Sequence, residues 1–467
     1  MMTAPDGLPT PTRYYAMVVV ILGITMSVLD GTIINLALPT IARELQADAA
    51  YSVWVINAYQ VCTLAMLLPC ASLGDLVGYR RVYLGGLVLF TLASLGCTFA
   101  HSLPALAAAR AVQGLGAAGI MSVNPALVRL IYPQRMLGRG VAINSVAVAV
   151  ASVAGPSLAA AILSIAAWQW LFAVNLPIGI VVLWFGFRSL PQNPAVRAAG
   201  SRLSWIDVAL NAAMFSLVFL GCRVGGTHSG GSGWLSGNMS SVIMLSAGVA
   251  VGVFYFRRQL RQALPIFPVD LMRIPVFALS IFTSVAAFAA QTLAYIALPF
   301  LLLEAYGHST AQAGLLITAW PLAVVATAPL AGYLIGRYPD GLLGGIGLGI
   351  LAAGLASLAG LPAAPTDGQI AWRLAVCGVG FGLFQSPNNH TIVTSAPIHR
   401  SGGASGMLGT ARLTGQTLGA VITAVVFSQA SAHDGRGPVI ALMLAVAFSA
   451  LAGVASTLRL RHPKADA

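Results

Sequence analysis

The chain has 467 residues, of which 58% are hydrophobic and 8% are charged, and its formal net charge is +12. Soluble domains carry about 25% charged residues, so this composition excludes most soluble folds. The positive charge does not indicate nucleic-acid binding, because the basic residues lie in short gaps between apolar runs, as at the cytoplasmic surface of a membrane protein. The five dispersed cysteines indicate neither a disulfide framework nor a metal site.

Apolar runs long enough to cross about 30 Å of hydrocarbon recur along the whole chain. The sequence therefore predicts an all-α polytopic membrane protein, with no cleavable signal peptide before the first run. The predicted helices are fourteen in number and lie near 14–39, 53–73, 82–100, 104–127, 138–163, 170–190, 206–222, 239–256, 276–302, 312–336, 342–361, 370–394, 403–428 and 438–458.

The positions of the basic residues predict how these helices are oriented. If the N-terminus is cytoplasmic, eighteen arginines and lysines fall in cytoplasmic segments, and only four, Arg43, Arg223, Arg373 and Arg436, fall in outer ones. Positive charge is enriched on the cytoplasmic side of membrane proteins. We therefore expect both termini to be cytoplasmic, in a multi-pass protein of the inner or plasma membrane.

The order of the runs predicts three parts. Residues 1–190 are expected to form a six-helix bundle, 191–270 a linker with an inserted transmembrane hairpin, and 271–467 a second six-helix bundle. The stretch LGDLVGYRRV at 73–82 has a faint copy, LAGYLIGRYPDG at 330–341, which keeps Gly332, Leu334 and Arg337. Internal repeats of this kind are common in secondary transporters.

The sequence lacks the signatures of nucleotide-driven or enzymatic chemistry. Its only lysine is Lys464, whereas a phosphate-binding loop requires Gly-Lys-Ser/Thr. GLGAAG at 114–119 matches the dinucleotide fingerprint formally, but it lies in a predicted membrane helix, where close helix packing is the expected role. The sequence therefore favours a gradient-driven carrier that uses no nucleotide, metal or other cofactor and is not an enzyme.

Five stretches carry a family resemblance. They are LDGTIINLALP at 29–39, LGDLVGYRRV at 73–82, LAAARAVQGLGAA at 106–118, AVASVAGPSLAA at 149–160 and WQWLFAVNLPIG at 168–179. In this order they resemble the signatures of the major facilitator superfamily, in particular its fourteen-helix drug:proton antiporters. The resemblance covers nearly the whole chain. It implies two six-helix bundles with an inserted hairpin, alternating access, and a monomeric transport unit in lipid that exchanges a small-molecule substrate for protons.

The stretch at 73–82 predicts a conformational latch. Gly74 and Gly78 permit a tight turn, and Asp75 is expected to cap a helix or to pair with Arg80 or Arg81. An ordinary basic loop is the alternative, but it leaves the Gly-Asp-Gly spacing unexplained.

The fifth predicted helix contains Gly155 and Pro156. This pair is expected to bend the helix and to let a neighbouring helix approach closely. The resemblance associates the motif with exporters and places it between the two bundles.

Asp30 is the only one of the twelve acidic residues that falls clearly within a predicted span. An ionisable group inside a membrane indicates function by default, and a permanently protonated structural carboxyl is the alternative. With a rise of 1.5 Å per residue, Asp30 in the first helix and Arg110 in the fourth lie at similar depths in the membrane. Their depths along the membrane normal differ by roughly 3 Å. We therefore expect the pair to face one cavity and Arg110 to control proton release from Asp30; a snorkelling structural Arg110 is the alternative.

Polar side chains within the predicted helices are expected to line a substrate cavity, although interhelical hydrogen bonding is an alternative for those in the second half. These residues are Asn35, Asn57, Gln60, Gln113, Asn124, Gln385, Asn388, Arg412 and Gln416. Glu304, at the outer end of the ninth predicted helix, is a candidate accessory carboxylate for substrate entry or proton release. A solvated interfacial carboxylate is the alternative at that position.

These features together predict a proton-coupled exporter of lipophilic cations that works by alternating access. Three alternatives remain open. They are an exporter of an endogenous metabolite such as an amino acid or siderophore, an uptake symporter, and a membrane sensor that transports nothing.

Overall fold

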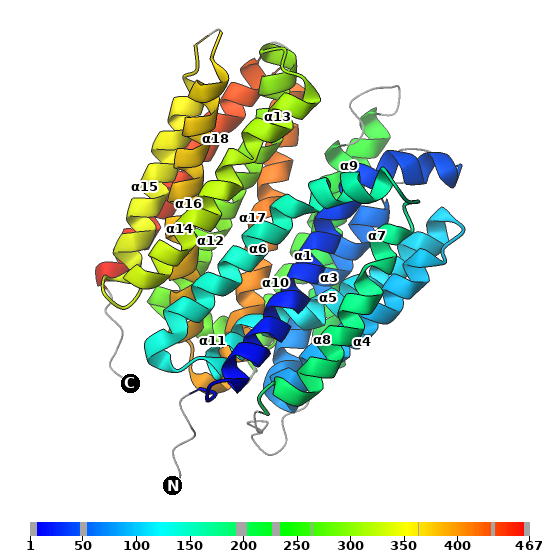
Figure 1. Ribbon diagram of the computed structural model, residues 1–467, viewed down its shortest axis with the longest axis vertical. Helices are drawn as coiled ribbons and strands as arrows, with labels where there is room; N and C mark the ends of the chain where they lie inside the picture. The colour runs from blue at the N-terminus through cyan, green and yellow to red at the C-terminus, as the bar shows by residue number, and fades with distance from the viewer. Residues whose placement is uncertain are drawn as a thin grey trace.

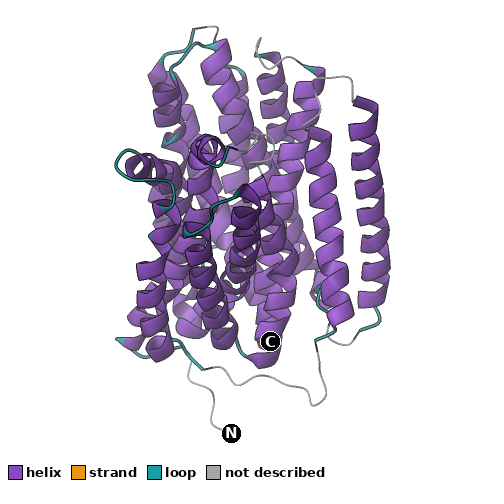
Figure 2. Cartoon of the chain, turned by 90° about the vertical axis from the view of Figure 1, so that its right-hand side faces the viewer, coloured by secondary structure: helices purple, strands orange, loops and turns teal. Residues whose placement is uncertain are grey.

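The computed structural model describes residues 7–46, 54–192, 203–226, 234–262, 265–362, 364–430 and 435–461. Within these ranges the regular structure is helical, and most of the long helices run side by side in roughly one direction (Figure 2). Within the predicted linker and hairpin at 191–270, residues 193–202, 227–233 and 263–264 lie outside the described residues, and so does Lys464.

The helices form two bundles that lie side by side (Figure 1). The N-terminal bundle contains α1 (Thr12–Glu44), α3 (Trp54–Val77), α4 (Tyr79–Thr98), α5 (Leu103–Ile131), α6 (Leu137–Leu163), α7 (Trp170–Ala173) and α8 (Asn175–Ser189). The C-terminal bundle contains α12 (Pro275–Phe300), α13 (Thr310–Ile317), α14 (Ala319–Leu334), α15 (Asp340–Ala359), α16 (Asp367–Ser395), α17 (Ser401–Gln429) and α18 (Arg436–Leu458), preceded by the short α11 (Val269–Met272).

A hairpin of two helices, α9 (Trp205–Gly226) and α10 (Trp234–Gln259), is inserted between the bundles in the sequence. The hairpin packs through α9 against α3 and α17. Asn211 of α9 donates a hydrogen bond to the carbonyl oxygen of Ala65 in α3 at 2.7 Å. Arg258 of α10 forms an ion pair with the buried Asp207 of α9, which ties the two hairpin helices together.

A helix occupies each of the fourteen predicted ranges. Among the described residues, ten helices are long and apolar enough to cross a membrane, which agrees with a multi-pass membrane protein. The others include α16 and α17, which contain the polar stretches FQSPNNH and SGGASG. The count of fourteen spans and the cytoplasmic location of the termini remain predictions.

The two bundles repeat one packing arrangement at the level of single residues. Gly114 of α5 lies so close to the carbonyl oxygen of Tyr59 in α3 that it leaves no room for a Cβ atom. Gly378 of α16 meets the carbonyl oxygen of Trp320 in α14 in the same way. The pair α5 and α3 therefore corresponds to the pair α16 and α14.

Hydrogen bonds between the first and fourth helices of each bundle match as well. Asn124 of α5 donates to the carbonyl oxygen of Val20 in α1 at 3.3 Å, and Asn388 of α16 donates to that of Ser280 in α12 at 3.3 Å. Asn124 and Asn388 follow Gly114 and Gly378 at the same spacing. These contacts define which residues of the two bundles are equivalent.

Candidate functional site

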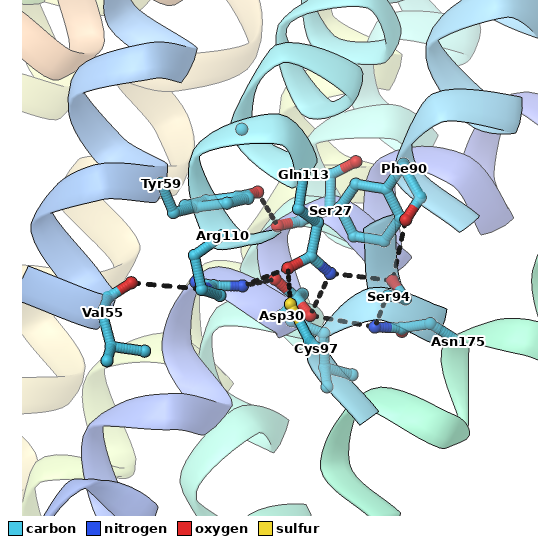
Figure 3. A network of polar contacts seen from close by, with 12 residues as sticks. Ser27, Asp30, Val55, Tyr59, Phe90, Ser94, Cys97, Arg110, Gln113 and Asn175 are labelled. Carbon is cyan, nitrogen blue, oxygen red and sulfur yellow. Dashed lines mark hydrogen bonds and ion pairs between the residues drawn. The ribbon is translucent and has the colours of Figure 1, made fainter. Parts of the chain in front are cut away.

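Asp30 lies in a buried polar cluster between helices α1, α3, α4, α5 and α8 of the N-terminal bundle (Figure 3). Asp30 is 1% exposed and Arg110 is fully buried. Nη1 of Arg110 donates to Oδ2 of Asp30, and the two form the predicted ion pair. Gln113 Nε2 and Asn175 Nδ2 each donate to Oδ1 of Asp30 at 2.9 Å. Both carboxylate oxygens therefore accept hydrogen bonds from the protein.

Arg110 is held in place by contacts other than Asp30. Its Nε donates to the carbonyl oxygen of Val55 at 3.2 Å, and its Nη1 donates to Oε1 of Gln113 at 2.7 Å. The guanidinium carbon lies 4.2 Å from the ring centroid of Tyr59, a distance at which a cation–π interaction is favourable. Tyr59 in turn donates to the carbonyl oxygen of Ser27 at 2.8 Å.

Three members of the cluster were not among the sequence-predicted site residues: Tyr59, Ser94 and Asn175. Ser94 Oγ accepts a hydrogen bond from Gln113 Nε2 at 2.8 Å, which orients the amide toward Asp30. Asn175 lies within the WQWLFAVNLPIG stretch that carries part of the resemblance, so a signal for it existed. Ser94 and Tyr59 resemble any other small polar or aromatic residue of a membrane helix, and only the tertiary structure identifies them.

The equivalent positions in the C-terminal bundle carry no charge. Val20 of α1 is equivalent to Ser280 of α12, and counting the same number of residues along each helix pairs Asp30 with Ala290. In the same way, the equivalence of Asn124 and Asn388 pairs Arg110 with Leu374. Gln113 is paired with Cys377 by the same spacing. Ala290, Leu374 and Cys377 are all fully buried members of the hydrophobic core of that bundle. These helices therefore pack well without a charge cluster, so the cluster is not a requirement of the packing.

The polar residues predicted to line a substrate cavity have different environments. Asn57 and Gln385 are buried, whereas Gln60 and Gln416 are half-buried. Gln113 belongs to the Asp30 cluster. The side chains of Asn35, Pro156 and Glu304 lie outside the described residues.

Arg412 of α17 carries a charge that no described carboxylate neutralises. Its Nε is buried and has no hydrogen-bond partner in the described part of the chain. It lies close enough to Tyr59 for an electrostatic interaction. Tyr59 therefore interacts with the Arg110 guanidinium of its own bundle and, electrostatically, with that of Arg412 in the other.

Asn124 and Asn388, which were also predicted to line the cavity, form hydrogen bonds between helices. Both are buried, at 1% and 0% exposure, and both donate to the backbone of a neighbouring helix. Asn388 also donates to Ser284 Oγ and accepts from Arg459 Nη1, each at 2.8 Å. Both amides therefore link neighbouring helices, and for Asn388 this is the alternative role that the sequence left open.

Asp75 forms a contact between the bundles. Its carboxylate accepts hydrogen bonds from the backbone N–H groups of Gly402 at 2.8 Å and Gly403 at 3.1 Å, at the start of α17, and from the hydroxyl of Tyr79 at 2.7 Å. Arg400 Nη1 lies 4.0 Å from Asp75 Oδ2. The first N–H groups of a helix have no partner within it and favour an anion, which explains this placement.

Asp75 therefore caps a helix, which is one of its two predicted roles, and the alternative pairing with Arg80 or Arg81 is wrong. Arg80 donates instead to the carbonyl oxygen of Phe187, and Arg81 is exposed. The chain turns directly before them at Gly78, which has a φ of 101°. Glycine adopts this conformation more readily than residues with a Cβ atom. This turn directs both arginines away from α17. At Gly74, an added Cβ would lie 2.8 Å from Val123 of α5, so glycine permits a close approach there.

A second contact between the bundles comes from Arg129 at the end of α5. Its Nη1 donates to the carbonyl oxygens of Val393 at 2.7 Å and Ala396 at 3.0 Å, and to Ser401 Oγ at 3.0 Å. Arg129 and Asp75 therefore join the N-terminal bundle to the segment around the start of α17. The molecule is closed at the end where these contacts lie.

Gly155 permits the close approach that the sequence predicts. A Cβ atom at this position would collide with the Thr32 side chain of α1. The same helix, α6, packs against α14 of the other bundle. The motif therefore lies in a helix that contacts both bundles, although Gly155 itself faces α1.

Comparison with known proteins places these observations in a family. The model of the Major Facilitator Superfamily matches residues 20–420 and 279–467. The chain is 52% identical over 464 residues to the "Uncharacterized transporter YebQ" of Escherichia coli, with 99% of each chain covered. It is 30% identical over 425 residues to the "Multidrug resistance protein Stp" of Mycobacterium tuberculosis, covering 90% of this chain and 77% of that protein.

A solved structure shows the same fold. The human organic anion transporter MFSD10 (TETRAN) superposes with a TM-score of 0.70 at 16% sequence identity, covering 96% of this chain and 100% of that one. The duplicated bundles, the motifs and these matches agree with one another. The chain belongs to the major facilitator superfamily of membrane transporters.

Proposed function

We propose that this protein is a proton-coupled exporter of lipophilic cations, in which Asp30 binds and releases the coupling proton. One observation carries the proposal: the N-terminal bundle buries Asp30 and Arg110 where the C-terminal bundle packs Ala290 and Leu374. Replacing a buried ion pair by apolar residues is often neutral or stabilising. A charge cluster that the fold does not need is therefore best explained by function.

The cluster is suited to exchange a proton for another ligand. When Asp30 is ionised, it accepts hydrogen bonds from Arg110, Gln113 and Asn175. Protonation of Asp30 removes the charge that attracts Arg110, so the guanidinium is free to take other partners. Because Arg110 also contacts Val55 and Tyr59 of α3, the protonation state of Asp30 is coupled to the position of that helix.

Alternating access would link this step to the closed end of the molecule. The contacts of Asp75 with α17, and of Arg129 with Val393 and Ser401, must break for that end to open. With fourteen spans and cytoplasmic termini, that end faces the cytoplasm. Proton uptake would then occur from outside in the present arrangement, and release would follow inward opening as the substrate binds.

The cationic cargo is inferred from the available carboxylate and from relatives. An intramembrane carboxylate offers a counter-charge to lipophilic cations such as quaternary ammonium compounds and cationic dyes. The relative from Mycobacterium tuberculosis is named a multidrug resistance protein, which supports the export of toxic compounds.

Everted membrane vesicles test the proposal. After an inward proton gradient is established, addition of a transported cation should release protons from vesicles that contain the protein. Vesicles with Asp30→Asn protein should show no substrate-induced release at equal protein content. If Asp30→Asn vesicles release protons as the wild type does, Asp30 is not the coupling site.

A second candidate, export of an endogenous metabolite, is favoured by Arg412. This arginine is the unneutralised charge beside Tyr59 at the meeting of the bundles, and it suits an anionic or zwitterionic substrate. A panel of lipophilic cations, applied to cells with and without the protein, distinguishes the two. Unchanged sensitivity to every cation, together with altered secretion of a metabolite, would replace the first candidate by the second.

A further inference from the structure

A cavity of about 620 Å³ lies between the two bundles at their closed end. The N-terminal bundle contributes Arg129, Arg135 and Arg139 to its lining, and the C-terminal bundle contributes Arg337 and His390. The described residues that line this cavity include no carboxylate. The cavity therefore gathers positive charge from both bundles.

Three arginines of this cavity have no carboxylate partner among the described residues. Arg135, Arg139 and Arg337 are exposed, and none forms an ion pair with a carboxylate in the described part of the chain. The neighbouring Asp340 is already bound by the His390 ring at 2.7 Å and by Thr391 Oγ1 at 3.0 Å. Arg337 stacks on the Tyr333 ring at 3.5 Å from its centroid, a contact that leaves the N–H groups at the edge of the guanidinium available to an anion, as are those of Arg135 and Arg139.

The internal repeat shows what occupies the equivalent place in the other half of the molecule. Where α3 meets α17, a Cβ atom at Gly406 would lie 2.5 Å from Ala71 Cβ. Where α14 meets α6, a Cβ atom at Gly332 would lie 2.5 Å from Ala142 Cβ. Ala142 follows Asn124 at the same spacing as Gly406 follows Asn388, so Ala142 and Gly406 are equivalent. The contact between α14 and α6 therefore has the same form as the contact between α3 and α17.

This copy lacks one side chain. Four residues after Ala71 stands Asp75, whose carboxylate binds the start of α17. Four residues after Gly332 stands Gly336, which has no side chain and lines the cavity. A Cβ atom built on Gly336 would have no protein atom within 4 Å. The chain therefore supplies a carboxylate to one inter-bundle contact, whereas the described lining of the other is basic and holds no carboxylate.

The border of the cavity is apolar. Tyr333 lines it and is 53% exposed, and Leu330, one helical turn earlier on α14, is 55% exposed. Ile143 of α6 is 42% exposed. The site therefore combines arginines at the helix ends with apolar surface along the adjoining helices, which matches the headgroup and acyl chain of a lipid.

We propose that this cavity binds the phosphate headgroup of an anionic phospholipid, which bridges the two bundles as Asp75 does in the other half. Arginine binds phosphate through paired hydrogen bonds, and basic pockets between membrane helices bind anionic headgroups. The bridge stabilises the closed arrangement, because its contacts with Arg135 and Arg139 on one side and Arg337 on the other are lost when the bundles separate.

Native mass spectrometry of the full-length protein in detergent tests this proposal. Dioleoyl-phosphatidylglycerol is titrated against the wild type and against Arg135→Gln/Arg139→Gln/Arg337→Gln protein. Because each arginine near an anionic headgroup contributes about a factor of five to binding, we expect the triple variant to bind the tightest lipid about a hundredfold more weakly. The matched control removes three exposed arginines outside the cavity, Arg188→Gln/Arg261→Gln/Arg273→Gln, and should bind as the wild type does.

A second pair of variants tests the role of the missing side chain. Gly336→Asp supplies a carboxylate within the cavity and should displace the lipid, whereas Gly336→Asn imposes the same backbone change at a φ of 84° without the charge. We expect only Gly336→Asp to weaken binding, by at least about tenfold. Equal lipid binding by these two variants, or by the two triple variants, overturns the proposal.

Soluble phosphate distinguishes the source of the anion. The same titrations are made with glycerol 3-phosphate and inorganic phosphate, and with dioleoyl-phosphatidylcholine as the uncharged lipid. We expect phosphatidylglycerol to bind more tightly than all three. Arginine-dependent binding of glycerol 3-phosphate without binding of phosphatidylglycerol assigns the cavity to a soluble phosphate and overturns the lipid proposal.

Discussion

The two bundles solve the same packing problem with different residues. Each places a glycine of its fourth helix against a carbonyl oxygen of its second helix, and an asparagine against the backbone of its first. Among the described residues, the N-terminal bundle alone buries a carboxylate between these helices, where the C-terminal bundle has Ala290 and Leu374. The repeat therefore separates residues that the fold requires from residues that it does not.

The ends of the second helices differ in a similar way. Asp75 reaches the start of α17, whereas its equivalent, Gly336, leaves a cavity lined by arginines. One inter-bundle contact is thus complete within the chain, and the other has unneutralised positive charge. Both differences lead to experiments in which one bundle is made to resemble the other.

The largest effect is expected from removing the charge of Asp30. Asp30→Asn keeps the size of the side chain but cannot bind and release a proton, so proton-coupled efflux should fall by at least about a hundredfold, on the scale seen when an essential proton-transfer group is removed. Efflux is measured in vesicles with equal protein content. Asp367→Asn is the control, because this carboxylate is 65% exposed and pairs only with His308 among the described residues.

The second prediction converts the charge cluster into its C-terminal counterpart. Asp30→Ala alone leaves the buried Arg110 without a counter-charge and should cost about 3–5 kcal/mol of stability. The triple variant Asp30→Ala/Arg110→Leu/Gln113→Cys carries the residues that the C-terminal bundle uses and should recover most of that loss while transporting nothing. Unfolding in detergent measures the stability. A triple variant less stable than Asp30→Ala would show that the cluster is needed for packing.

The third prediction distinguishes the role of Arg110 from that of Arg412, the two arginines that interact with Tyr59. Arg110→Ala removes the positive charge next to Asp30 and so disfavours the ionised carboxylate. Proton release then requires a higher pH, and the pH optimum of transport should rise by about one unit or more. Arg412→Gln removes a charge that is not paired with Asp30 and should leave the pH optimum in place. Arg110→Ala protein with an unmoved pH profile would contradict the coupling.

The smallest effect is expected at the inter-bundle contact. Asp75→Asn removes the charge that binds the N–H groups of Gly402 and Gly403, an interaction typically worth about 0.3–1 kcal/mol. The closed arrangement should lose up to about fivefold in population relative to the open one. Spin labels at Arg81 and Ile398, both exposed, report the separation of the bundles. An unchanged distance distribution would show that Asp75 does not hold them together.

Much of the molecule could be predicted from its residues alone. Long apolar runs can only be satisfied as helices within a membrane, because every backbone group must find its partner inside the segment, and so the helical ranges were predictable. Asp30 and Arg110 were identifiable because a charge inside an apolar run is costly and therefore conspicuous. Their pairing followed from depth, since a helix has a fixed rise per residue.

What the residues did not determine is which polar groups meet across helices. Asp75 has arginines five and six positions along the chain, yet it binds the start of α17, because the turn at Gly78 and the docking of the second bundle place free N–H groups there. Asn124 and Asn388 look like cavity residues in a list of polar positions, but their partners are backbone oxygens on neighbouring helices. Tyr59, Ser94 and Asn175 join the Asp30 cluster from separate helices. Local sequence fixes where a side chain sits along its own helix, and only the packing of helices against one another decides which atoms it contacts.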